Sequence, residues 1–105
     1  MKVDFFHTKE CHIWKTALSV LEDALADAGV EQNYCVSVIT SDEEAEEFKF
    51  TGSPTILVNG ANVDPMRRKV TKFVALGCAP YFWNQKTFEY PPKEMILQAL
   101  SESKQ

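Results

Sequence analysis

One amphipathic segment between two short apolar runs does most to limit how this chain of 105 residues can fold. Between Cys11 and Gly29, apolar side chains recur with a period of about 3.6, which predicts a helix with one continuous buried face. Gly29 predicts a left-handed C-cap, closed by Val30 folding back on Leu25. The flanking runs 2–6 and 34–39 predict strands, so the whole forms a βαβ unit with a right-handed crossover. The apolar positions of the helix are Ile13, Trp14, Ala17, Leu18, Leu21, Ala24, Leu25 and Ala28.

The middle of the chain predicts a short acidic helix followed by a third strand. Ser41 and Glu44 have the spacing of a capping box, in which each residue satisfies a backbone N–H at the helix start. Residues 55–58, Thr-Ile-Leu-Val, are mostly apolar and rich in β-branched side chains, and they lead into the turn sequence Asn59-Gly60. This pattern predicts a strand that ends in a tight turn.

Residues 61–77 allow two interpretations. Asp64 as N-cap, Pro65 at the first helical position and Gly77 at the end would bracket a helix, which we favour. The β-branched residues of the segment allow a strand instead. After it, the aromatic run 81–83 predicts a short strand.

A last helix is predicted to begin at Pro91-Pro92, because proline is favoured at the start of a helix. Ile96, Ala99 and Leu100 would form its buried face. The sequence shows no internal repeat or linker, so residues 1–105 are expected to form a single domain.

Composition limits the class of function. The chain is 45% hydrophobic and 25% charged, as in ordinary globular domains, and its net charge of −4 argues against nucleic acid as a general partner. No stretch is apolar enough to cross a bilayer and no export signal is evident, so we expect no membrane contact and a cytoplasmic location. Three cysteines make an odd count without a disulfide framework, which agrees with a reducing compartment.

The charge is unevenly distributed along the chain. The first fifty residues carry eleven of the fifteen acidic side chains. Four bases cluster in the second half, at Arg67, Arg68, Lys69 and Lys72. This cluster is either a solvated surface or a site for an anionic substrate or partner.

Cys11 is the strongest candidate for a functional side chain. It lies where the first strand leads into the first helix, and the unpaired N–H groups of a helix start favour the thiolate, which attacks disulfides and binds soft metals. The alternative is that Cys11 packs as a small apolar residue. His7 and His12 flank it and could assist proton transfer, or they could be exposed residues of the loop and helix start. Cys35, in an apolar strand, is expected in the core.

Two motifs carry a resemblance to the thioredoxin fold. One is Cys11-His12-Ile13-Trp14, between the first strand and the first helix. The other is the segment 52–60, Gly-Ser-Pro-Thr-Ile-Leu-Val-Asn-Gly, which resembles the thioredoxin segment with a cis-proline. The resemblance implies a thioredoxin-like α/β fold, with a central mixed four-stranded sheet flanked by helices. It also implies a cis Ser53-Pro54 bond beside Cys11, at the start of a strand antiparallel to the first.

The chain is also similar to small thioredoxin-like proteins grouped by name with alkylmercury lyases. These share a Cys-x-x-Trp start, the Gly-Ser-Pro-Thr segment and a later cysteine followed by tyrosine, which Cys78-Ala79-Pro80-Tyr81 matches in its cysteine and tyrosine only. Trp14 stands where thioredoxins have their second cysteine, so the usual dithiol motif is incomplete.

The resemblance implies thiol chemistry on a small thiol or disulfide, or on a thiol-containing protein, without a cofactor. Cys11 would be the nucleophile and Cys78 the candidate resolving thiol, although an unpaired Cys78 is equally compatible with the sequence. Ser53, Pro54, His12 and Trp14 would contact the substrate; core packing is the alternative for Trp14. Two other functions stay open, namely soft-metal or organometal binding through both thiols, and a redox-inactive interaction module. Oligomeric state is not predicted.

Overall fold

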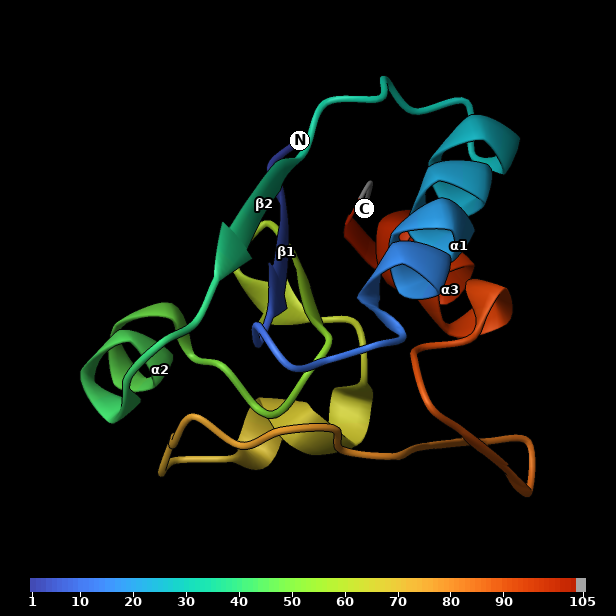
Figure 1. The fold of residues 1–105 in the computed structure, drawn as a ribbon. Helices are drawn as coiled ribbons and strands as arrows, with labels where there is room; N and C mark the ends of the chain where they lie inside the picture. Colours follow the sequence, from blue (N-terminus) through green and yellow to red (C-terminus); the bar gives the residue numbers. More distant parts are fainter. Residues whose placement is uncertain (104–105) are drawn as a thin grey trace.

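A mixed sheet of four strands forms the centre of the protein, in a computed structural model that describes residues 1–103 (Figure 1). The strands are β1 (Val3–His7), β2 (Cys35–Val38), β3 (Thr55–Val58) and β4 (Ala61–Asn62), in the order β2-β1-β3-β4. β1 is parallel to β2 and antiparallel to β3, and β3 is antiparallel to β4. The predicted α/β class and mixed four-stranded sheet are therefore confirmed.

Two helices, α1 (Trp14–Asp27) and α3 (Lys93–Ser103), cover one face of this sheet (Figure 1). α1 ends as predicted, because Gly29 has φ +68° and the N–H of Val30 donates to the carbonyl of Leu25 at 2.9 Å. The main core lies between these helices and the sheet. Its fully buried side chains include Phe5, Leu21, Leu25, Ile56, Tyr81, Ile96 and Leu100.

The opposite face is covered by the short helix α2 (Asp42–Phe48) and by an irregular segment, residues 70–76. The predicted cap is present, since the N–H of Glu44 donates to Ser41 Oγ at 3.2 Å, while the Glu44 carboxylate reaches back to the N–H of Thr40. A smaller cluster of Phe6, Ile39, Ala45, Phe50 and Leu57 lies here, with Phe73 and Ala75 packed against it.

The prediction of a helix over residues 61–77 is wrong for most of the segment. Only η1 (Pro65–Lys69) is helical, as a 3-10 helix, and Asp64 caps it as predicted by accepting from the N–H of Met66 at 3.0 Å. Beyond it the backbone makes no helical ladder, and part of it bonds to distant groups. The N–H of Ala75 donates to Asp42 Oδ1 at 2.8 Å, for example. Tertiary contacts therefore replace the helix.

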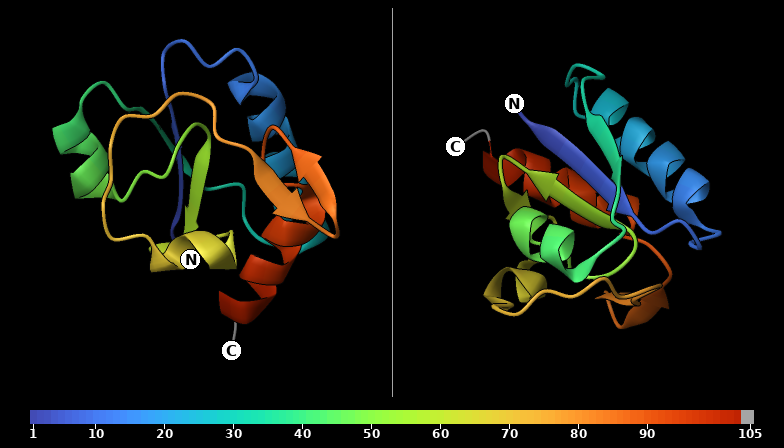
Figure 2. Two further views of the ribbon diagram at one scale, coloured as in Figure 1. Left: turned by 90° about the horizontal axis from the view of Figure 1, so that it is seen from below. Right: turned by 60° about the vertical axis from the view of Figure 1, so that its left-hand side comes forward.

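The aromatic strand forms as predicted but lies outside the central sheet. β5 (Tyr81–Trp83) pairs only with β6 (Lys86–Phe88), in a hairpin that Figure 2 shows apart from the sheet. The fourth strand of the sheet is instead β4, which the turn at Asn59 and Gly60 places beside β3. Of the helices in residues 1–103, none has the length and hydropathy needed to cross a membrane.

Candidate functional site

Cys11 lies in a turn between β1 and α1 rather than in the helix itself. α1 begins at Trp14 with Ile13 as its N-cap, so Cys11 precedes the cap by two residues, and its N–H donates to the carbonyl of Thr8 at 3.3 Å. The residue is only 3% exposed. The thiol therefore sits beneath other parts of the chain and does not open directly to solvent.

The predicted cis bond between Ser53 and Pro54 is present. Ser53 is fully buried and its Oγ accepts from the N–H of Thr8 at 3.1 Å, which joins this segment to the turn that carries Cys11. β3 then runs antiparallel to β1, as expected. Ser53 and Cys11, far apart in sequence, thus belong to one site, at the end of the sheet where β1 finishes and β3 begins.

Residues 77–80, here called the strap, form hydrogen bonds with both backbone groups of Ser53. The N–H of Ser53 donates to the carbonyl of Gly77 at 2.9 Å, and the N–H of Ala79 donates to the carbonyl of Ser53 at 3.3 Å. Ser53 and Cys78 are therefore paired as in a parallel sheet. Ser53, which the resemblance implies as a substrate contact, therefore has both of its backbone groups bonded to the strap in this conformation.

Gly52 makes this close approach possible. It has φ +116°, and a Cβ added to it would lie 2.4 Å from the Cβ of Ala79, well inside contact distance. A side chain at position 52 would therefore push the strap away from Ser53.

Arg67 fastens the strap to the rest of the fold. Its guanidinium lies 3.6 Å from the ring centroid of Tyr81, pairs with Asp64 at 3.3 Å, and donates to the carbonyls of Thr51 and Pro80 at 3.2 and 2.5 Å. Arginine suits such a position because its planar fork donates in several directions at once. The sequence places Arg67 in a basic cluster that predicts either a solvated surface or an anion site, and nothing local marks its structural role.

The strap brings Cys78 to Cys11. Desolvation raises the pKa of the Cys78 thiol, and the neighbouring Cys11 raises it further through its charge and a side-chain hydrogen bond, followed by the charge of Glu89. Cys78 is nevertheless exposed as a residue, in contrast to Cys11. Beside it lies an open, largely apolar groove of about 210 Å³. The groove is lined by Cys78, Ala79, Pro80, Thr87, Phe88 and Glu89.

The two histidines have different environments. His7 ends β1, is buried, and stacks on Trp14 with 4.2 Å between ring centroids and 4° between planes. Its Nδ1 lies 2.9 Å from the carbonyl of Thr8. The interpretation of His7 as an exposed loop residue is therefore wrong, because β1 extends one residue beyond the predicted strand. His12 is exposed, and Trp14 is half-buried and packs against the core.

Cys35 is not part of the core. It is exposed on β2, an edge strand, and α2 packs beyond the end of that strand (Figure 1). An apolar run alone did not reveal that this strand lies at the edge. In residues 1–103 no group of three or more His, Cys, Asp or Glu side chains is arranged to hold a metal ion.

The fold and site define a small α/β protein with a mixed sheet and two cysteines at the end of the sheet where β1 finishes and β3 begins. Within that class, the chain belongs to the family described as Domain of unknown function (DUF2703), whose model matches residues 8–100 and so includes Cys11, Ser53 and Cys78. No curated protein and no solved structure matches the chain.

Proposed function

We propose that this protein performs thiol–disulfide exchange, with Cys11 and Cys78 as a dithiol pair in a thioredoxin-like fold. The observation that carries the proposal is the pairing of the strap with Ser53, which sets Cys78 beside Cys11. The arrangement of β1, β2 and β3, with a cysteine after β1 and a cis-proline before β3, supports the thioredoxin-like relation. Cys78 takes the place of the second cysteine that Trp14 replaces in the local motif.

Burial assigns the two thiols different roles in this proposal. Cys78 is exposed beside a groove, whereas Cys11 is 3% exposed. A substrate disulfide in solution therefore meets Cys78 first, and Cys11 acts from inside as the resolving thiol. This order is the reverse of the one that the sequence motif implied.

The reaction then has two balanced steps. The Cys78 thiolate attacks one sulfur of a substrate disulfide, forming a mixed disulfide and releasing the other half of the substrate as a thiolate. Cys11, after losing its proton to water, attacks the Cys78 sulfur and releases the second half, which leaves a Cys11–Cys78 disulfide. The substrate disulfide is reduced by two electrons and the protein dithiol is oxidised. An external thiol then reduces the protein again.

The raised pKa of Cys78 sets the pH dependence of the first step. Because only the thiolate attacks, the rate is expected to rise with pH through and beyond the ordinary range of a cysteine. A reducing compartment such as the cytoplasm would keep the pair in the dithiol form, ready for a small disulfide or a protein disulfide.

The test uses the reduced chain of residues 1–105 with 2-hydroxyethyl disulfide, a neutral substrate, and dithiothreitol as the external thiol. We expect turnover above the uncatalysed rate in the native protein and in Cys35→Ser, which alters the exposed cysteine outside the site. Cys78→Ser should lose all reaction. When dithiothreitol is left out, Cys11→Ser should stop at a mixed disulfide on Cys78, whereas the native protein should proceed to the Cys11–Cys78 disulfide and release both halves of the substrate. Peptide mapping should find a Cys11–Cys78 disulfide after oxidation. Equal activity in Cys35→Ser and the Cys11→Ser, Cys78→Ser double variant would reject the proposal.

Soft-metal or organometal binding is the second candidate function, because two neighbouring thiols form a ligand pair suited to Cu(I) or Hg(II). Stoichiometric binding without disulfide turnover, lost in both Cys11→Ser and Cys78→Ser but kept in Cys35→Ser, would favour it. If neither binding nor turnover depends on these cysteines, the interaction-module interpretation is the one that survives.

A further inference from the structure

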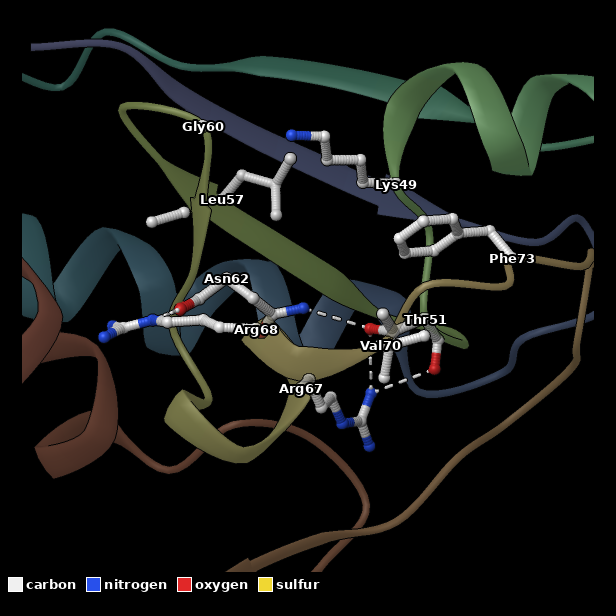
Figure 3. Close-up of a pocket in the computed structure, with 10 residues that line it drawn as sticks. Lys49, Thr51, Leu57, Gly60, Asn62, Arg67, Arg68, Val70 and Phe73 are labelled. Carbon is white, nitrogen blue, oxygen red and sulfur yellow. Dashed lines mark hydrogen bonds between the residues drawn. The ribbon is translucent and has the colours of Figure 1, made fainter.

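A separate cavity of about 350 Å³ lies on the sheet face that α2 and residues 70–76 cover (Figure 3). Its size is in the usual range for small-molecule sites. Leu57 forms the floor, and Val70 and Phe73 add apolar walls. The complete lining is Lys49, Thr51, Leu57, Gly60, Ala61, Asn62, Arg67, Arg68, Val70 and Phe73.

The charged side chains of the lining are all cationic. They are Lys49, Arg67 and Arg68, and the lining contains no acidic residue. This cationic lining contrasts with the net charge of −4 on the whole chain. Charge complementarity therefore points to an anionic occupant.

The three cations are not equally available. Arg67 is only 12% exposed at its side chain and is already committed to Asp64, Thr51 and the strap. Arg68 donates from Nε to the carbonyl of Asn62 at 2.7 Å and extends toward Glu102 at 3.7 Å, so that its stem rather than its charge faces the cavity. In Figure 3, Lys49 reaches from the end of α2 toward Gly60, above Leu57.

The backbone of Lys49 is fixed at the end of α2, and its side chain is exposed. Lys49 is the C-cap of α2, with φ +59° and ψ +42°, and its N–H donates to the carbonyl of Ala45. The carbonyl end of a helix also favours a cation at this point. The ammonium group is thus presented over an apolar floor, where an anion loses part of its competing hydration.

The neutral polar groups of the cavity are occupied within the protein. Asn62 Nδ2 donates to Thr51 Oγ1 at 3.0 Å, and Asn62 Oδ1 accepts from the N–H of Asp64 at 2.9 Å. A ligand with many hydroxyl groups would find few free partners here. A ligand with one anionic group for Lys49 and an apolar body for Leu57, Val70 and Phe73 matches the surface.

We infer that this cavity is a binding site for a small amphipathic anion, namely a carboxylate or sulfonate attached to an aliphatic or aromatic body. The site is distinct from the thiol pair and does not depend on the proposed exchange activity.

The test titrates the full chain with 1-anilinonaphthalene-8-sulfonate, an apolar anion, and with N-phenyl-1-naphthylamine, its neutral counterpart. We expect saturable binding of the anion, weaker binding of the neutral compound, and amide shift changes centred on Leu57, Gly60 and Asn62 in NMR spectra. Lys49→Gln should weaken binding of the anion about two- to fivefold, as expected for one partly exposed ion pair, and leave the neutral compound unaffected.

Lys72→Gln is the matched control, because it removes the same charge from an exposed residue of segment 70–76 that does not line the cavity. Its affinity for the anion should equal that of the native protein. Val70→Ser, at a 39% exposed wall position, should weaken both compounds. Equal losses in the two lysine variants, equal affinity for both compounds, or shift changes away from this face would overturn the inference.

Discussion

The two faces of the sheet are built differently. On one face, α1 and α3 bury Phe5 and Ile56 completely. On the other, α2 and the irregular segment 70–76 leave a cavity of about 350 Å³ over Leu57. The strap with Cys78 is the continuation of that same irregular segment.

The two faces differ in packing because regular helices cover one of them and a largely irregular segment covers the other. Regular helices offer repeated side chains that interdigitate with a sheet and close the core. An irregular backbone spends its N–H and carbonyl groups on distant partners, as the strap does on Ser53, and leaves gaps between its side chains. Stability is therefore expected to concentrate on the helical face and binding chemistry on the other.

Adjacent residues of β3 provide the sharpest test of this difference. Ile56 faces the helices and is 0% exposed, whereas Leu57 faces the cavity and is 7% exposed. Ile56→Ala should cost about 3–5 kcal/mol of unfolding free energy and Leu57→Ala about 2 kcal/mol or less, because Leu57 already borders empty space. Urea unfolding measures both losses of free energy, and the comparison holds if the m values of the two variants equal that of the native protein. Equal losses would mean that the two faces are equally well packed.

Substitutions at two glycines distinguish the effect of displacing the strap from the effect of backbone strain alone. Gly60→Ala should cost about 1–2 kcal/mol, since φ is +83° but nothing lies within 4 Å of the added Cβ. Gly52→Ala should cost about 1–3 kcal/mol more, because the new Cβ meets Ala79. It should also increase the alkylation rate of Cys11, which Gly60→Ala should not change. A Cys11 that stays protected in Gly52→Ala would show that the strap does not cover it.

A buried hydroxyl beside the thiol site offers a smaller test. Within residues 1–103, Thr8 Oγ1 is buried and has no hydrogen-bond partner. Thr8→Val keeps the shape of the side chain and removes the unpaired group, so it should raise stability by up to about 1 kcal/mol. The backbone bond from Thr8 to Ser53 is unaffected by this change. A clear loss of stability in thermal unfolding would contradict the prediction.

The smallest expected effect concerns the charge near Cys78. Glu89 raises the pKa of the Cys78 thiol, so Glu89→Gln should lower that pKa and increase the thiolate fraction. Alkylation of Cys78 at pH 7 should become about two- to threefold faster, the size expected from one exposed charge. Mass spectrometry across a pH series measures this rate. Glu46→Gln makes the same charge change at an exposed position of α2, and it should leave the alkylation rate of Cys78 unchanged.

The sequence by itself determined the features that depend on near neighbours. The amphipathic character of α1, its closure at Gly29, the caps at Ser41 and Asp64, and the turn at Asn59-Gly60 all appear as predicted. The start of α1 does not, because the helix begins at Trp14 rather than at Cys11. Each confirmed feature is decided by side-chain periodicity or by hydrogen bonds across a few residues, and such patterns can be recognised in the sequence.

Only the tertiary structure decided which residues meet. The pairing of Cys78 with Ser53, the burial of His7, the exposure of Cys35 and the anchoring role of Arg67 all depend on contacts between distant segments. An apolar run with a cysteine has the same sequence pattern whether its strand is central or at an edge of the sheet. A basic cluster likewise has the same pattern whether or not one of its arginines is buried. The physical reason is that burial and pairing belong to the assembled surfaces, and local propensity does not specify how those surfaces come together.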